Sequence, residues 1–300
     1  MPRRRTDVPP LEPVAVVGAG AVGTALALRC AEAGLNVATV TSRTNRSATR
    51  LARTVGASTV PLTDVDAPVV LLAVPDDAVA TVARTLADAH VDWRGRAVAH
   101  TSGVLPAAVL APLAQRGALA LSLHPPRALP PGSNARALDG AMVVLEGSDD
   151  ACAWGDAFAR RLGLATLRLD ADAKVRYHLA LSVASNFTVT LTALAAEILG
   201  SAGVPLPDAL ALVRPLVHST AENLAHALPE RALTGPIVRG DTTTLARHLE
   251  ALEAHLPHLV PVYAALATET ARVAVRGGRL APRAAEAMLD RLGDALHDET

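Results

Sequence analysis

A glycine-rich turn near the start of the chain constrains the fold more than any other feature. Gly18-x-Gly20-x-x-Gly23 directly follows an apolar run and opens a helical pattern. The first glycine permits a tight turn, the second lets a pyrophosphate approach the backbone, and the third lets helix and strand pack closely. Free N–H groups at the helix start favour phosphates. We therefore expect a dinucleotide to bind here, along Gly18, Ala19, Gly20, Ala21, Val22 and Gly23.

The first half of the chain alternates apolar runs with helical patterns, which is typical of a parallel sheet covered by helices. Gly34 stands where a helix would end before the second apolar run. Proline and glycine cluster at residues 124–132, which predicts a loop. The expected strands are residues 14–18, 36–41, 68–74, 96–101, 118–124, 141–146 and 165–169, and the expected helices are residues 21–33, 45–55, 77–89, 105–116 and 150–162.

After about residue 170 the strand-like runs stop and helical periodicity takes over. We expect an α/β Rossmann domain with a doubly wound, mostly parallel sheet at residues 13–169, followed by an all-helical bundle domain at residues 170–300. Residues 1–12 are expected to be a disordered lead-in, because prolines follow the basic start. The expected helices of the second domain are residues 173–199, 207–227, 242–256, 258–275 and 282–296.

The composition argues against several classes of function. Half of the residues are hydrophobic and the net charge is -1, so no basic excess favours nucleic acid. Cys30 and Cys152 suit a reduced, cytoplasmic protein and suggest neither a disulfide framework nor a metal site. Residues 177–196 carry no charge and could span a bilayer by length. Their His, Ser, Asn and Thr side chains are costly in lipid, so we expect a buried core helix and no membrane partner.

The end of the second expected strand indicates which cofactor binds. NAD enzymes usually place Asp or Glu there for the ribose hydroxyl, whereas this chain has VATVTSRTNR, without a carboxylate. Ser42, Arg43 and Thr44 can hold a 2′-phosphate, and the Arg43 guanidinium supplies charge and a planar donor fork. We therefore expect NADP(H). The alternative is that Arg43 and Arg46 only solvate the start of a helix.

The expected strand at residues 68–74 ends in Val74-Pro75-Asp76-Asp77. The carboxyl end of this strand would line the nicotinamide side of the crevice, so Val74 and Pro75 are expected to contact the cofactor. Asp77 is expected to cap the following helix, and neither aspartate is assigned a catalytic role.

The composition also points to Lys174 as the catalytic residue. It is one lysine among 28 basic residues, the others being arginines, which indicates a task that needs an ammonium able to lose a proton. Partial burial beside a nicotinamide would lower its pKa and make it a general acid. A spacing of four places His178, Ser182 and Asn186 on adjoining helical turns. The alternatives are that Lys174 is an ordinary surface lysine and that His178 is a core histidine whose hydrogen bonds are satisfied within the protein.

Further polar residues are expected to bind the substrate. The loop LTGPIVRGDTTTL at residues 233–245 offers Arg239, threonine hydroxyls and a helix N-terminus to a carboxylate, and Asp241 is a strong helix cap. The alternative is a well-capped linker. Ser102 and His124 stand at expected strand ends, where ligands bind in such sheets, although turn and cap roles are equally open. The expected substrate ligands are Ser102, His124, Ser182, Arg239 and Asp241.

The segments GAGAVG, VTSRT, VPDDAV, HTSG, LHP, K-x-x-Y-H, ASNF and LTGPIVRGD, in that order, resemble a bacterial Rossmann-like family whose C-terminal part is domain of unknown function 2520. That family is similar to ketopantoate reductase, pyrroline-5-carboxylate reductase and the β-hydroxyacid dehydrogenases. The resemblance implies an NADP-binding domain and a helical domain that often dimerises. It also implies that Lys174, with His178 one turn later, acts at a carbonyl. HPPRAL stands where the family usually has HPLQTF.

These observations predict an oxidoreductase that transfers a hydride from NADPH to the carbonyl carbon of a small 2-oxo acid, with ketopantoate as the first substrate to test. Lys174 would be the general acid, His178 and Asn186 would orient the carbonyl, and Arg239 would hold the carboxylate. One alternative is reduction of a cyclic imine such as pyrroline-5-carboxylate. A second alternative is a non-catalytic NADP(H) sensor. A homodimer through the helical domain is the expected assembly.

Overall fold

A computed structural model describes residues 8–297, without the side chains of residue 291 and residues 294–297. The chain forms two compact units that divide between Ser185 and Asn186. The sequence placed this boundary near residue 169 instead. The division falls inside helix α6 (Lys174–Ser201) because the first turns of that helix pack with the preceding sheet through the buried side chain of Lys174.

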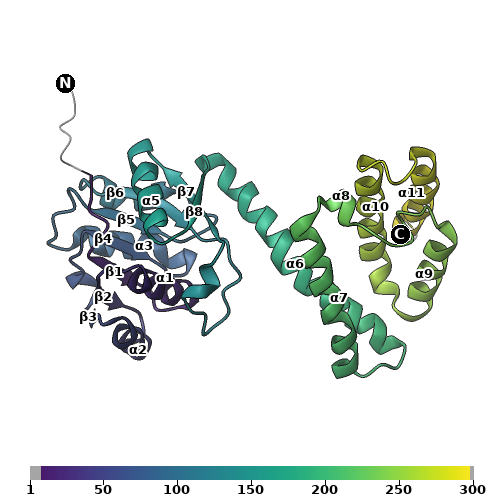
Figure 1. Cartoon of the computed structure of the whole chain (residues 1–300), viewed down its shortest axis with the longest axis horizontal. Helices are drawn as coiled ribbons and strands as arrows, with labels where there is room; N and C mark the ends of the chain where they lie inside the picture. The colour runs from purple at the N-terminus through teal and green to yellow at the C-terminus, as the bar shows by residue number, and fades with distance from the viewer. Residues whose placement is uncertain (1–7, 298–300) are drawn as a thin grey trace. The chain divides into compact units, whose positions relative to one another are not determined.

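The first unit is built on one sheet. Within the described residues its strands have the order β3-β2-β1-β4-β5-β6-β7-β8, and all neighbours are parallel except β6 and β7 (Figure 1). Chain order reverses between β1 and β4, which is the switch point where open α/β sheets bind ligands. The strands are β1 (Val14–Val17), β2 (Val37–Thr41), β3 (Ser58–Thr59), β4 (Val69–Leu72), β5 (Ala97–His100), β6 (Leu119–His124), β7 (Met142–Gly147) and β8 (Ala165–Arg168).

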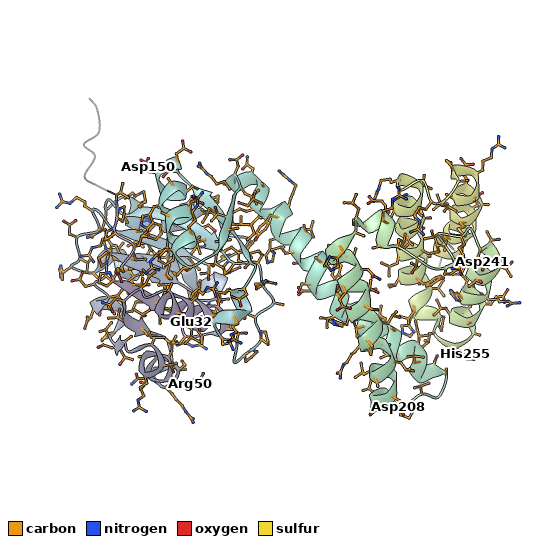
Figure 2. All side chains as sticks on the ribbon, viewed as in Figure 1. Glu32, Arg50, Asp150, Asp208, Asp241 and His255 are labelled. Carbon is orange, nitrogen blue, oxygen red and sulfur yellow. The ribbon has the colours of Figure 1, made fainter. Side chains whose placement is uncertain are left out.

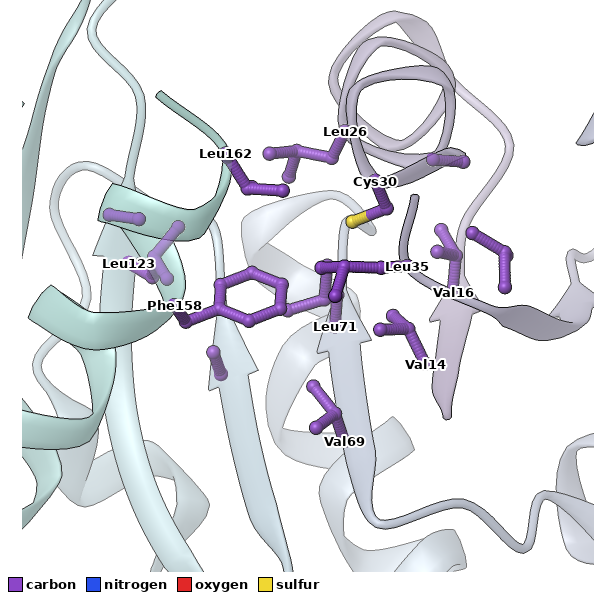
Figure 3. Close-up of a cluster of buried hydrophobic side chains, with 14 of the residues drawn as sticks. Val14, Val16, Leu26, Cys30, Leu35, Val69, Leu71, Leu123, Phe158 and Leu162 are labelled. Carbon is purple, nitrogen blue, oxygen red and sulfur yellow. The ribbon is translucent and has the colours of Figure 1, made fainter. Parts of the chain in front are cut away.

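Helices cover both faces of this sheet, as the doubly wound prediction requires. Strand side chains alternate, so Val14 and Val16 join one buried cluster while Ala15 and Val17 join another. Figure 3 shows the first cluster, where Phe158 lies among side chains of the strands and of α1. The helices are α1 (Ala21–Glu32), α2 (Asn45–Val55) and α5 (Asp149–Arg161) on that face, and α3 (Asp76–Asp88) and α4 (Ala111–Ala114) on the other.

The segment before β1 differs from the expected lead-in. Residues 1–7 of that segment lie outside the described residues, but Pro9 is buried, and the indole Nε1 of Trp154 donates to its carbonyl at 3.1 Å. Leu11 packs against the first cluster. The prediction of disorder is therefore wrong for residues 8–12, because the buried indole takes its hydrogen-bond acceptors from this segment.

Two local expectations also need correction. Ser58–Thr59 forms the edge strand β3, which is too short and polar to show as an apolar run. The helix expected at residues 105–116 is broken into a 3₁₀ turn (Ala107–Leu110) and α4, because Pro106 and Pro112 interrupt the backbone N–H donors. The remaining 3₁₀ turns are Leu62–Asp64, Ala135–Leu138, Ala171–Ala173 and Pro257–Leu259.

The second unit is helical. Its core gathers apolar residues of the last three helices, among them Leu245, Ala264 and Met288. The side chain of Asp241 accepts from the backbone N of Thr244 at 2.9 Å and caps α9, as the sequence predicts (Figure 2). The helices after α6 are α7 (Leu206–His226), α8 (Pro229–Ala232), α9 (Thr242–His255), α10 (Val260–Arg276) and α11 (Pro282–His297).

Helix α6 is not the buried core helix that its composition predicted. Val175, Val183 and Phe187 are each about half exposed or more. By length and hydropathy the segment Ala171–Ser201 could cross a membrane, and only 6% of its most apolar window is buried in the chain. The prediction failed because an apolar helix can be covered by another surface as well as by its own chain.

Candidate active site

A groove of about 1070 Å³ runs along the carboxyl ends of β1, β2 and β4. The glycine turn forms its floor. A Cβ atom on Gly18 would lie 2.1 Å from the carbonyl oxygen of Ala73, and one on Gly23 would lie 1.9 Å from that of Gly18. These two glycines are therefore required by the packing of the chain itself, which brings the ends of β1 and β4 and the start of α1 together.

Gly20 differs from its two neighbours. Its φ of -78° suits any residue, and a Cβ atom there would meet nothing within 4 Å. Gly20 lines the groove and is the N-cap of α1, and no side chain caps this helix end. No protein atom near Gly20 requires a glycine, and its backbone is open to a ligand in the groove. A pyrophosphate at an uncapped helix N-terminus meets that description.

The far end of the groove fits a phosphorylated ribose. Ser42, Arg43 and Thr44 line it, and the Arg43 side chain is exposed. Ser47 lies beside them and hydrogen-bonds the hydroxyls of Thr44, at 2.5 Å, and Ser42, at 3.4 Å. Sequence reasoning missed Ser47, although it follows Thr44 by one helical turn. Three hydroxyls beside a guanidinium can bind a 2′-phosphate.

Val74 and Pro75 line the same groove, together with Ala73 and Asp77. The expected capping role of Asp77 is wrong. Helix α3 begins one residue earlier, at Asp76, with Pro75 as its N-cap and no side-chain cap. Both carboxylates lie in the first turn of α3, where they interact favourably with the helix dipole.

Lys174 is completely buried at the ends of β5 and β6. Its Nζ donates to the carbonyl oxygen of Ser102 at 3.2 Å and to the Oγ of Ser122. Ser122 also donates to the Ser102 carbonyl oxygen, at 3.3 Å. The surface alternative for Lys174 is thus wrong. Sequence reasoning missed Ser122 because a serine inside an apolar strand carries no local signal.

Burial controls the protonation of this lysine. Desolvation lowers the pKa of Lys174 to about 8, and the carboxylates of Glu146 and Asp76 oppose this shift. An ammonium with such a pKa holds its proton near neutral pH and can release it at small cost.

Two imidazoles lie in the same region, the buried His100 and the half-buried His124. Burial and then the charge of Lys174 lower the pKa of both His100 and His124 to about 4. The Nδ1 of His124 lies 2.7 Å from the hydroxyl of Tyr177, with the two rings edge to face. His100 is held by its own loop, since its Nδ1 accepts from the backbone N of Ser102. Both histidines are therefore neutral at pH 7.

The hydroxyl of Ser102 accepts from the backbone N of Val104 and of Leu105. This is the turn role that the sequence left open, and the contribution of Ser102 to the site is its carbonyl oxygen. Gly103 follows it, and a Cβ atom there would lie 2.9 Å from the Cδ2 of His178 and 3.1 Å from the Nε2 of His124. The first unit thus brings Lys174, His124 and His178 to one place.

The other expected site residues have separate settings. Ser182 is half-buried on α6 in the first unit, while Asn186, Arg239 and Asp241 belong to the second. Arg239 is exposed in the loop before α9. Asp241 is engaged as a helix cap, since it also accepts from the Thr244 hydroxyl at 2.6 Å. Its carboxylate therefore has a structural task, whereas Arg239 is accessible to a ligand.

Comparison with protein families agrees with this architecture. Residues 2–125 match the Rossmann-like domain, and residues 141–270 match domain of unknown function 2520. The chain therefore has the Rossmann-like plus DUF2520 organisation that its motifs indicated. No curated protein matches the chain.

Solved structures resemble the chain over nearly its whole length. A Bacteroides fragilis protein assigned as an NADP oxidoreductase is 26% identical, with a TM-score of 0.69 over 87% of this chain and 98% of its own. A Thermotoga maritima protein is 25% identical, with a TM-score of 0.71 over 88% and 99%. An imine reductase from Myxococcus stipitatus, in complex with NADP+, shares the fold at 19% identity, with a TM-score of 0.57 over 96% and 95%.

The open space at Gly20 yields a prediction. Gly20→Ala is expected to lower the melting temperature only slightly, because alanine is a poorer N-cap than glycine, and to weaken NADPH binding about 10-fold or more, because the methyl group occupies space left for the ligand. Differential scanning calorimetry and titration calorimetry measure the two effects. The matched variant Gly23→Ala should lose stability, since its methyl group meets the Gly18 carbonyl. A Gly20→Ala protein with wild-type affinity would contradict the assignment.

Proposed function

We propose that this protein is an NADP(H)-dependent oxidoreductase that reduces the carbonyl group of a small 2-oxo acid, with ketopantoate as the first substrate to test. The observation that carries the proposal is the buried ammonium of Lys174, which has a pKa of about 8 and lies beside two neutral histidines. A proton donor of this kind at the carboxyl ends of β5 and β6 suits reduction of a polar double bond.

Cofactor binding is supported by the groove and by the relatives. Gly20 leaves room for a pyrophosphate, and the hydroxyls of Ser42, Thr44 and Ser47 gather beside Arg43. The Bacteroides fragilis relative is assigned as an NADP oxidoreductase, and the imine reductase binds NADP+. When bound, NADPH supplies the hydride.

Lys174 is proposed to donate its proton to the carbonyl oxygen as negative charge develops there. The Ser102 carbonyl and the Ser122 hydroxyl accept two of its N–H bonds, which leaves the third for the substrate. Among the other predicted residues, His178 and Asn186 are proposed to orient the carbonyl and Ser182 to contact the substrate. Arg239 is proposed to hold the carboxylate, since its guanidinium is exposed and suits bidentate binding.

The imine alternative has its own support, because the Myxococcus stipitatus enzyme shares the fold. An imine nitrogen gains a proton as its carbon gains a hydride, so Lys174 would serve either reaction. NADPH oxidation measured side by side with 2-oxo acids and cyclic imines separates the two. Turnover of imines alone would overturn the carbonyl assignment, and tight NADPH binding without any turnover would favour a sensor.

Arg43 provides a test of cofactor choice. Arg43→Ala is expected to weaken NADPH binding roughly 10- to 100-fold, because hydrogen bonds to a charged partner contribute about 1.5–3 kcal/mol, and to leave NADH binding nearly unchanged. Titration calorimetry with both dinucleotides measures the difference. Arg50→Ala is the control, since Arg50 is exposed on α2, the helix that follows Arg43, and does not line the groove (Figure 2). Equal losses for NADPH and NADH would refute the 2′-phosphate role.

Lys174 provides the test of chemistry. Lys174→Ala is expected to lower kcat on the order of 10²-fold or more, the usual contribution of a positioned acid. In the wild type, kcat for reduction should fall as the pH rises through about 8, because the acid must be protonated. The charged groups acting on Lys174 are Glu146 and Asp76, and His100 and His124 stay neutral in this range. Steady-state kinetics against pH measures both effects, and undiminished turnover in Lys174→Ala would remove Lys174 from the mechanism.

We also propose that a second copy of the chain covers the apolar side chains that the second unit exposes on α6 and α7. Val189 is 70% exposed, Leu216 is 67% exposed and Leu212 is 62% exposed. Large apolar side chains exposed on neighbouring helices of the chain are candidates for an interface, since the cores of homodimer interfaces are apolar.

Val189→Asp is therefore expected to turn a dimer into a monomer, because a buried unpaired carboxylate is costly at an interface. Light scattering after size exclusion measures the mass. Met142→Asp is the matched control, since Met142 is an exposed apolar residue of β7 in the first unit. A wild-type protein that is monomeric at micromolar concentration would contradict the proposal.

A further inference from the structure

Tyr177 has no role in the mechanism so far, yet it makes the closest contact to His124. Its hydroxyl lies 2.7 Å from the Nδ1 of His124, and the ring planes meet at 81°. His124 ends β6, while Tyr177 lies in the first turn of α6, one residue before His178. The sequence motif K-x-x-Y-H contains this tyrosine without indicating its task.

The direction of this hydrogen bond follows from protonation. Burial raises the pKa of Tyr177 to about 12, so the phenol keeps its hydrogen. Burial, the charge of Lys174 and then that of His178 lower the pKa of His124 to about 4, against a smaller opposing effect of Asp76, so the imidazole is neutral. A neutral imidazole carries one N–H, on either Nδ1 or Nε2.

The phenol is the donor. Among the residues that the structure describes, the Tyr177 hydroxyl has no hydrogen-bond partner except His124 Nδ1. If Nδ1 carried the hydrogen, the phenol hydrogen would lack a protein acceptor in a half-buried position, which is unfavourable. The Tyr177 hydroxyl therefore donates to Nδ1, and the imidazole hydrogen is on Nε2.

Gly103 lies beside this Nε2 atom. A Cβ atom on Gly103 would lie 3.1 Å from the His124 Nε2 and 2.9 Å from the His178 Cδ2. Gly103 does not adopt a left-handed backbone conformation, so the glycine is needed for space rather than for its φ angle. The edges of both imidazoles thus lie over Gly103, close to the Ser102 carbonyl that holds Lys174.

We propose that Tyr177 is a positioning residue that fixes His124 as a neutral Nε2–H donor. In the proposed reduction, on which this role rests, the Nε2–H of His124 binds the carbonyl oxygen that Lys174 protonates. A neutral donor suits the site because a second cation beside the Lys174 ammonium would be repelled. Without the phenol, the ring could turn Nε2 into an acceptor, which would repel a developing oxyanion.

The tautomer can be measured without a substrate. In the NADP+-loaded protein with ¹⁵N-labelled histidine, the His124 resonances, assigned by their loss in His124→Gln, are expected to show hydrogen on Nε2. Tyr177→Phe should give a mixture of tautomers. Tyr263→Phe is the matched control, because its hydroxyl makes the same contact to the Nδ1 of His248, at 2.8 Å and edge to face, within the second unit. A wild-type His124 with hydrogen on Nδ1 would overturn the inference.

Kinetics test what this donor does. Tyr177→Phe is expected to lower kcat about 10-fold and to leave NADPH affinity unchanged. A roughly 10-fold effect corresponds to the loss of one neutral hydrogen bond at the upper end of the usual range of strengths. Tyr263→Phe should keep wild-type kcat. His124→Gln should retain more activity than His124→Asn, because the glutamine amide reaches the Nε2 position, and adding Tyr177→Phe to His124→Gln should cost nothing more.

The two proposals fail separately. Wild-type kcat in Tyr177→Phe, or equal activity of His124→Gln and His124→Asn, would overturn the role of the positioned donor while the reduction itself stands. A wild-type protein that shows the Nε2–H tautomer but reduces neither 2-oxo acids nor imines would overturn the proposed function and support the positioning of His124.

Discussion

The contact between the Lys174 ammonium and the ends of β5 and β6 is the interaction on which the candidate site depends. It joins the first turn of α6 to the Ser102 carbonyl and the Ser122 hydroxyl. By holding this turn against the sheet, it also places Tyr177 and His178 beside His124. A buried ammonium costs free energy unless it is hydrogen-bonded, and the two acceptors of Lys174 offset part of that cost. Burial, with the charge of Lys174 as the second cause, lowers the pKa of two neighbouring imidazoles and keeps them neutral.

The glycine turn divides its work between the fold and the ligand. Gly18 and Gly23 are required by carbonyl oxygens about 2 Å from their absent side chains, whereas the space at Gly20 is empty of protein atoms. The motif therefore has two parts. Gly18 and Gly23 allow β1 and α1 to pack closely, and Gly20 leaves the N-terminus of α1 open. Gly103, which follows the carboxyl end of β5, resembles Gly18 and Gly23, because two imidazole edges occupy the space that its side chain would fill.

Much of this could be predicted from the sequence. The apolar runs that alternate with helical patterns, and the glycine turn after the first of these runs, predicted a parallel sheet covered by helices. Lys174 stood out because every other basic residue is an arginine. Ser122 and Tyr177 were missed because their importance arises from neighbours distant in sequence or from a register that only the folded sheet sets. Ser47 was missed although its neighbours Ser42 and Thr44 are close in sequence. The burial of α6 was mispredicted because an apolar pattern predicts a helix but does not indicate which surface covers its apolar side chains.

The positions of the two tryptophans have a practical consequence. Trp154 donates to the Pro9 carbonyl and stacks on Phe158, and Trp93 donates to the Leu86 carbonyl, so both indoles are buried in the first unit. The sequence contains no other tryptophan. Tryptophan emission, excited selectively, therefore follows the melting of the Rossmann unit alone, while far-ultraviolet circular dichroism follows both units. Divergence between the two signals on heating directly measures whether the halves of this protein unfold as one cooperative system.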